Sequence, residues 1–369
     1  MNQPGLEGVV AAATGLSDVD GERGELTIGG FPLAELAEHA TFEETMWLLW
    51  HGALPSARQL RTFRDELASQ RELAPATVAL LRVCAAAGIS PIDALRIAAG
   101  TISLVSDSAV AIAAQCPVIV AAYSRLSGGV EPLPPRRDLG HAANFLYLLN
   151  GQEPDPERVR ALTIYLNTVV DHGLNASTFT ARVITSTGSD LVSAVVGAIG
   201  ALKGPLHGGA PGPALDMVFE IGEASRAEAI LRRKIERGEK LMGFGHRIYR
   251  VRDPRADVLA AAAERLFTRA GDMSLYTLAR SVEATALRLL EEYKPGRRLQ
   301  TNVEFYTALL LHGLGLEVSL FTPTFAIGRV AGWIAHATEQ QRANRIIRPQ
   351  SEYVGVRNRR WIPVESRRS

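Results

Sequence analysis

Apolar side chains recur at three- and four-residue spacing along most of this chain, and this helical periodicity constrains the fold more than any other feature. In ATFEETMWLLWHGALP (40–55), Thr41 and Glu44 form a capping box before an apolar face, and Gly52 and Pro55 end the segment. The same pattern predicts helices over 56–70, 75–87, 91–104, 108–126, 138–149, 156–170, 176–187 and 189–204. Strand signals are sparse, the clearest being ELTIGG at 25–30. We therefore expect a mainly α fold.

The charge pattern changes after residue 224 and suggests a second domain. Between about 224 and 295, segments such as RAEAILRRKIERGEK predict smaller helices with broad solvent-facing sides. No internal repeat of fixed period is present, which argues against a helical solenoid. The last residues, RNRRWIPVESRRS, are typical of an exposed tail or of an arm that lies on a neighbouring subunit.

Bulk composition excludes several classes of partner. The formal net charge is +1, so no global field favours nucleic acid or an anionic membrane. The longest uncharged run, SAVAIAAQCPVIVAAYS, is just short of a usual membrane span and carries Pro117, so a buried core helix is the better interpretation. Cys84 and Cys116 lie in apolar surroundings without a metal-like spacing. They predict buried free thiols in a reducing, cytoplasmic compartment, and no secretory leader opens the chain.

Three histidines are placed where side chains can project into a cleft. His172, His207 and His246 each lie at a predicted helix end or turn, and His246 is followed in GFGHRIYRVRDPRA by four arginines. For a lone histidine, a structural hydrogen-bonding role is the more common alternative. We assign that structural role to the other five, His39, His51, His141, His312 and His336.

The local spacing of these histidines does not predict a metal site, because HxH and HExxH are absent. GxSxG, GxGxxG and Walker patterns are also absent, which argues against a serine triad and against nucleotide binding by those routes. Glu304, at a helix start in TNVEFYTALLLHG, is either a favourable charge at a helix N-terminus or a general base. Arg329 interrupts an apolar helix and should have an anionic partner, from the protein or a substrate.

In order and spacing, these motifs resemble the citrate synthase family over nearly the whole chain. The resemblance is carried by the N-terminal GLEGVVAAATGLSDVDGERGELTIGGF and by LNASTF, GPLHGGA, GFGHRIYRVRDPRA, TNVEFY and RPQSEYVG. It implies an acyltransferase that condenses acetyl-CoA with oxaloacetate and then hydrolyses the citryl thioester, with no metal or redox cofactor.

The resemblance also implies residue roles. Glu304 would be the base, His207 would stabilise the enolate, and His246 would polarise the oxaloacetate ketone. Further contacts with oxaloacetate would come from His172, Arg255, Phe325, Arg329 and Arg348, the last from the partner subunit, and Arg250 would contact CoA phosphate. Arg247 and Arg252 would be structural or solvent-facing.

The implied fold has two domains, a large one formed by residues 1–207 and 316–369 and a smaller inserted one formed by 208–315. Closure of the small domain would exclude water, and a homodimer would share each active site. Glu304 stands where the family usually has aspartate, and the extra methylene moves the carboxylate. A 2-methylcitrate synthase using propionyl-CoA, a weakly active binding or regulatory protein, and a helical interaction scaffold are the alternatives.

Overall fold

The structure is a computed structural model that describes residues 4–6, 8–104, 106, 108–207 and 211–367. Its N-terminal region contains a three-stranded antiparallel sheet in the order β1 (Ser17–Asp20), β2 (Glu25–Ile28) and β3 (Phe31–Pro32). Ser17 pairs with Ile28 and Asp20 with Glu25, so the first two strands form a hairpin. The strand predicted at 25–30 is confirmed.

Helices make up most of the rest of the described chain, which confirms the mainly α prediction. The first ten are α1 (Leu33–His39), α2 (Phe42–His51), α3 (Ala57–Ser69), α4 (Pro75–Ala86), α5 (Pro91–Ala99), α6 (Ala109–Ser127), α7 (His141–Asn150), α8 (Pro156–Val169), α9 (Ala176–Ser186) and α10 (Leu191–Leu202). They are followed by α11 (Pro211–Ile221), α12 (Ala227–Glu236), α13 (Pro254–Ala270), α14 (Ser274–Tyr293), α15 (Val303–Gly313) and α16 (Phe321–Arg342).

Several helix ends lie where the local signals predicted them. Thr41 and Glu44 form the capping box of α2, and Gly52 ends that helix in the left-handed conformation. Asp190, rather than Ser189, caps α10, because its carboxylate accepts the backbone N–H of Ser193. The segment predicted as one helix over 91–104 is α5 followed by a 3₁₀ turn over Gly100–Leu104.

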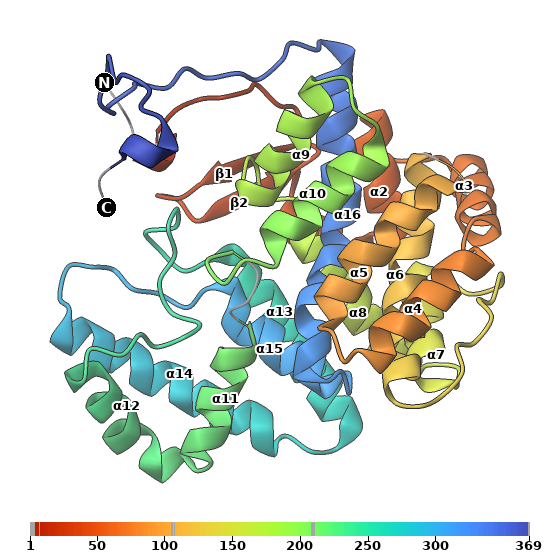
Figure 1. Cartoon of the computed structure of the whole chain (residues 1–369). Coiled ribbons are helices and arrows are strands. Elements are labelled where there is room, and N and C mark those ends of the chain that lie inside the picture. The colour runs from red at the N-terminus through yellow and green to blue at the C-terminus, as the bar shows by residue number, and fades with distance from the viewer. Residues whose placement is uncertain (1–3, 7, 105, 107, 208–210, 368–369) are drawn as a thin grey trace.

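The long helix α16 is central to the core and contacts α2, α6, α8, α9 and α10 (Figure 1). Trp333 and Ile334 of this helix are fully buried. Two apolar stretches, Ala109–Ser127 and Val318–Arg342, are long and apolar enough to cross a membrane by length and composition, but most of each is buried inside the protein. Core helices have this property, as predicted for the run around Pro117.

Helices α11, α12 and α14 group at one end of the molecule, at the lower left of Figure 1. Helix α12 packs on α14, α11 packs on α15, and α13 packs on both α15 and α8. This part of the chain contains the charged segments noted in the sequence. The domain boundaries at 207/208 and 315/316 remain predictions, and residues 208–210 lie outside the described part of the chain.

Candidate active site

Two of the three predicted histidines form a cluster together with Tyr249. His172 follows α8, and His246 lies in the loop that leads to α13. Their ring centroids are 5.7 Å apart, and the Tyr249 ring lies 5.6 Å from His172 and 4.8 Å from His246. The Tyr249 hydroxyl is 3.1 Å from His172 Nε2. The fold therefore brings together histidines that are 74 positions apart in the sequence.

The glycines before His246 allow its loop to lie against the start of α15. Gly243 has φ +87°, and a Cβ there would lie 2.9 Å from the Cβ of Phe305. The Gly245 N–H donates to Gln300 O at 2.7 Å, and the Asn302 N–H donates to Gly243 O at 3.0 Å. A side chain at Gly243 would break this close approach. The pairing places the His246 loop beside the helix start that carries Glu304.

The hydrogen bonds of His246 assign its tautomer. The N–H groups of Ile248 and Tyr249 donate to His246 Nδ1 at 3.0 and 3.1 Å, so Nε2 carries the proton of the neutral ring. Burial, reinforced by the charge of Arg255, lowers the pKa of His246 to about 4. His246 Nε2 lies 3.3 Å from Nη2 of Arg255. Two donors thus converge, and an oxygen atom of a ligand can accept from both.

Arg255 is held by a bidentate pair with Asp253. Its Nε and Nη2 donate to the two Asp253 oxygens at 3.0 and 2.8 Å. Asp253 also caps α13 and accepts the Val303 N–H at the start of α15 at 3.2 Å. A single carboxylate therefore joins the first turns of two helices and orients a buried guanidinium.

Glu304 lies in the first turn of α15, where the Asn302 side chain accepts its backbone N–H at 3.0 Å. Burial raises the pKa of the Glu304 carboxyl to about 7, with the positive charge of Arg255 opposing this shift and the negative charge of Asp253 adding to it. A carboxylate with this pKa is matched to proton transfer near neutral pH.

His207 lies in the turn after α10 and is held by Ser177. The Ser177 N–H donates to His207 Nε2 at 3.3 Å, and the Ser177 hydroxyl is 2.9 Å from the same nitrogen. Because Nε2 accepts, the neutral ring carries its proton on Nδ1. Burial and the charge of Arg329 lower the pKa of His207 to about 4. The Trp333 indole N–H donates to the Ser177 hydroxyl at 3.1 Å, which connects this arrangement to α16.

Arg329 is a buried cation whose guanidinium is incompletely paired. Its Nε donates to Val169 O at the end of α8 at 2.5 Å, and its guanidinium lies 4.8 Å from the ring centroid of Phe325, one turn earlier. Nη1 has no hydrogen-bond partner among the described residues. Burial, with the charge of Arg255, lowers the pKa of Arg329 to about 10. An anionic ligand would compensate this charge.

Two glycines of α16 allow Arg329 to reach the end of α8. A Cβ at Gly332 would lie 2.2 Å from Val170 O, and a Cβ at Gly328 would lie 2.7 Å from a methyl group of Val169. The backbones approach closely because these positions have no side chain. The end of α8 therefore presents a carbonyl to the arginine, and a helix C-terminus favours a cation.

These residues also influence one another electrostatically. The charge of Arg329 acts on His172 and His207, and the charge of Arg255 acts on His172, Glu304 and Arg329. Burial first, and then these two arginines, lower the pKa of His172 well below its ordinary value. Arg255 has Asp253 as its charged partner, whereas Nη1 of Arg329 has no hydrogen-bond partner among the described residues, so Arg329 is the group most suited to an anionic ligand.

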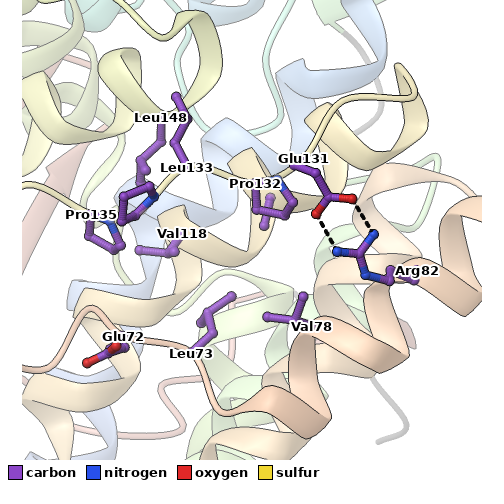
Figure 2. Close-up of a pocket in the computed structure, with 12 residues that line it drawn as sticks. Glu72, Leu73, Val78, Arg82, Val118, Glu131, Pro132, Leu133, Pro135 and Leu148 are labelled. Atoms are coloured by element: carbon purple, nitrogen blue, oxygen red, sulfur yellow. Dashed lines mark hydrogen bonds and ion pairs between the residues drawn. The ribbon is translucent and has the colours of Figure 1, made fainter.

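A separate, mostly apolar pocket lies between α4, α6 and the loop before α7 (Figure 2). At one side Arg82 forms an ion pair with Glu131, and its Nη1 donates at 2.8 Å. The pocket is lined by Glu72, Leu73, Val78, Arg82, Val118, Ala122, Glu131, Pro132, Leu133, Pro134, Pro135 and Leu148. None of the clustered histidines, Glu304 or the two buried arginines lines it.

Residues 5–350 match the family model described as "Citrate synthase, C-terminal domain". The chain belongs to the citrate synthase family. Citrate synthase 2 of Bacillus subtilis is 40% identical over 375 residues, which cover 98% of each chain. The 2-methylcitrate synthase of Shewanella oneidensis is 39% identical over 374 residues, covering 98% of this chain and 97% of the relative.

Solved structures agree with this assignment and confirm the citrate synthase-like fold. Citrate synthase from Pyrobaculum aerophilum has a TM-score of 0.90 at 39% identity, covering 100% of this chain and 97% of that one. The citrate synthase of Thermoplasma acidophilum, in a ternary complex with carboxymethyl coenzyme A and oxaloacetate, has a TM-score of 0.89 at 27% identity and 98% coverage of both chains. The chain is a condensing acyltransferase of the citrate synthase type.

Two arginines with expected roles lie apart from this cluster. Arg250 is exposed beside the β1–β2 hairpin, and its N–H donates to Gly21 O at 2.9 Å. Arg348 is exposed in the segment after α16, where the neighbouring Ile347 N–H donates to the Ser186 hydroxyl at the end of α9. Ser177, which holds His207, lies at the opposite end of α9. Arg348 is therefore not brought to this chain's own site, and its role through a partner subunit stays a prediction.

Sequence reasoning missed Tyr249, Asp253 and Ser177. Asp253 precedes Pro254 at a helix start, so its N-cap signal was available. The contact of Tyr249 with His172 spans 77 positions, and that of Ser177 with His207 spans 30. Neither contact has a local sequence signature, because the partners meet only after the helices pack.

Proposed function

We propose that this chain condenses acetyl-CoA with oxaloacetate and hydrolyses the resulting thioester to citrate and CoA. The observation that carries the proposal is Arg329, a buried guanidinium whose Nη1 lacks a partner among the described residues and which lies in a site shared with Arg255. One carboxylate of a small dicarboxylate would supply the anionic oxygen that Arg329 lacks, and the other would lie at Arg255 beside its pair with Asp253.

Oxaloacetate recognition is assigned to both cations and to neutral side chains. Arg255 and Arg329 would bind its carboxylates, with His172 as a further contact and Phe325 shaping the pocket beside Arg329. The free Nε2–H of His246, converging with Arg255, would donate to the ketone oxygen. Arg348 of the partner subunit would complete the site in a homodimer.

Acetyl-CoA is activated by removal of a methyl proton next to the thioester carbonyl. The Glu304 carboxylate would take this proton, and the His207 Nδ1–H would donate to the thioester oxygen as negative charge develops there. The enolate carbon then attacks the ketone carbon of oxaloacetate, and water cleaves the thioester. The pKa of about 7 at Glu304 and about 4 at His207 support these roles, because the base is ionised in part and the donor is neutral.

The remaining assignments concern CoA binding, domain closure, cofactors and location. Exposed Arg250 would contact a phosphate of CoA, and closure of residues 208–315 over the remainder would exclude water. Proton transfer and carbon–carbon bond formation between two substrates use the acid–base groups of the chain, so no resident cofactor is assigned. A cytoplasmic location is in keeping with the buried free thiols Cys84 and Cys116.

A 2-methylcitrate synthase is the second candidate, because the Shewanella oneidensis relative of that name is nearly as similar as the Bacillus subtilis citrate synthase. Propionyl-CoA differs from acetyl-CoA by one methylene, which changes discrimination only about 10- to 200-fold.

The test is release of free CoA thiol by purified protein given oxaloacetate and either thioester. Fast release that Glu304→Gln abolishes, and that the exposed-carboxylate control Glu291→Gln retains, would establish the condensing activity. The preferred thioester then chooses between the two candidates. Tight oxaloacetate binding without release from either thioester would overturn the catalytic proposal in favour of a binding or regulatory role.

A further inference from the structure

A series of hydrogen-bonded, buried polar side chains ends at Asp171, the residue before His172. Asp171 and His336 are both 0% exposed, and Arg182 is 2% exposed. His336 Nε2 lies 3.1 Å from each Asp171 carboxylate oxygen. Nε and Nη2 of Arg182 lie 3.0 and 2.9 Å from His336 Nδ1. The proposed chemistry uses none of these three groups.

Arg182 determines which atoms donate and which accept among these hydrogen-bonded side chains. A guanidinium only donates, so His336 Nδ1 accepts and His336 Nε2 carries the proton that Asp171 accepts. Arg182 also forms an ion pair with Glu339. Each buried charge thus has a partner, and removing the imidazole would leave Asp171 without its main one.

Ser17 of β1 binds the backbone on the other side of His172. Its hydroxyl donates to Asp171 Oδ2 at 2.5 Å and accepts the Gly173 N–H at 2.9 Å. Gly173 has φ +59°, a conformation that glycine adopts without strain. The residues before and after His172 are therefore tied to one hydroxyl group.

Helix α16 supports the same segment from a second direction. Arg329, Trp333 and His336 are spaced four and three residues apart, so they share one face of α16. Arg329 binds Val169 O, Trp333 binds the Ser177 hydroxyl, and His336 binds Asp171. The loop that carries His172 is consequently held on both flanks by buried hydrogen bonds.

We propose that Ser17, Asp171 and His336 are positioning residues that hold His172 against oxaloacetate and so set the affinity for this substrate without contacting it. The inference rests on the proposed function, in which His172 touches oxaloacetate. A misplacement on the order of 1 Å can cost roughly a hundredfold in reaction rate, so a substrate contact depends on the hydrogen bonds that hold its side chain in place.

The first test is Ser17→Ala, which removes one hydroxyl without opening a large cavity. Calorimetric titration with oxaloacetate should give a Kd raised about fivefold to tenfold, as expected for a lost pair of hydrogen bonds. In a His172→Ala background, Ser17→Ala should cause no further change, because its effect passes through His172. The matched control Ser69→Ala, whose hydroxyl bonds within α3, should leave the Kd unchanged.

The second test compares two substitutions of His336. His336→Leu should raise the oxaloacetate Kd about 50-fold and leave the KM for the thioester unchanged. His336→Gln, whose amide can both donate and accept, should recover most of the affinity. The control His141→Leu replaces another buried histidine, which packs on Phe42 of α2, and should not change the Kd of the folded protein. If His336→Leu does not fold, the comparison of Ser17→Ala in the wild-type and His172→Ala backgrounds tests the positioning role.

The outcomes separate this inference from the proposed function. A wild-type protein that does not bind oxaloacetate would overturn both. Wild-type binding with equal Kd in Ser17→Ala, or additive effects of Ser17→Ala and His172→Ala, would overturn the positioning role alone. Lower thermal stability of the variants with an unchanged Kd would likewise reduce the network to a purely structural one.

Discussion

The Tyr249 hydroxyl lies 3.1 Å from Nε2 of His172, and both side chains are buried. Burial raises the pKa of Tyr249 above its ordinary range, so the hydroxyl keeps its proton at neutral pH and can donate to the imidazole. In that arrangement His172 Nδ1 carries the proton of the neutral ring. A tyrosine that sequence reasoning missed thus orients a histidine that it found.

Replacing Tyr249 with phenylalanine should weaken oxaloacetate binding while keeping the ring contacts with His172 and His246. We expect the KM for oxaloacetate to rise about fivefold, in line with the loss of one hydrogen bond, with kcat changed less than twofold. Steady-state kinetics at saturating thioester would measure both. Tyr147→Phe in α7 is the control, and an equal rise of KM in that variant would contradict the orienting role.

The pH dependence of turnover should follow Glu304. Its pKa of about 7 is that of the free protein, and the base is active when deprotonated. We therefore expect kcat/KM for the thioester to increase as pH rises through about 7 and then to level off. A pH–rate profile from 5 to 9 measures this, and a flat profile across 6 to 8 would argue against Glu304 as the base.

Glu304 should also make the folded protein less stable as pH rises. Its folded pKa of about 7 exceeds the ordinary 4.5, so the folded state binds more protons than the unfolded state between these values. Stability therefore falls as pH increases through that window, and the full loss is present above pH 7. Glu304→Gln should remove this dependence and raise the Tm relative to wild type at pH 8 but not at pH 4. Scanning calorimetry at both pH values would decide.

Arg329→Met should separate binding from stability. The change removes a buried cation with an unpaired Nη1, so the ligand-free protein should be at least as stable as wild type. Oxaloacetate binding should weaken at least about 100-fold, because a charge-assisted contact with a carboxylate is lost. Thermal melts with and without oxaloacetate measure both effects. A variant that is stabilised by the ligand as strongly as wild type would contradict the assignment.

Gly332→Ala should disturb the site through packing alone. The added Cβ would lie 2.2 Å from Val170 O, so α16 and the end of α8 must separate, at a cost of about 2–4 kcal/mol in the free energy of unfolding. Gly200→Ala in α10 is the matched control, because its nearest neighbour would be the Arg96 Cδ at 3.8 Å. The control should be neutral or stabilising by up to about 1 kcal/mol. Urea denaturation compares the two, and equal midpoints would show that the close approach is not required.

Local signals predicted the helices well because helix ends are determined by neighbouring residues. Thr41 with Glu44, and Gly52, act within a few positions, and the structure confirms their roles. Predicted helix ends singled out His172, His207 and His246, and the family resemblance added Arg255 and gave the site residues their roles. Their assembly could be expected only from the resemblance, since no spacing in the sequence places His172 beside His246.

What the tertiary structure alone reveals is how those side chains are held and charged. The pKa values of Glu304 and His207 depend on burial, and burial depends on the packing of α9, α15 and α16. The contact of His336 with Asp171 spans 165 positions, and the approach of Gly332 to Val170 depends on two helices crossing at a given depth. Capping and periodicity act over one or two helical turns, so the sequence specifies the elements and the order of the reactive groups. Hydrogen bonds and desolvation at the site arise between distant segments, and they exist only once the core has formed.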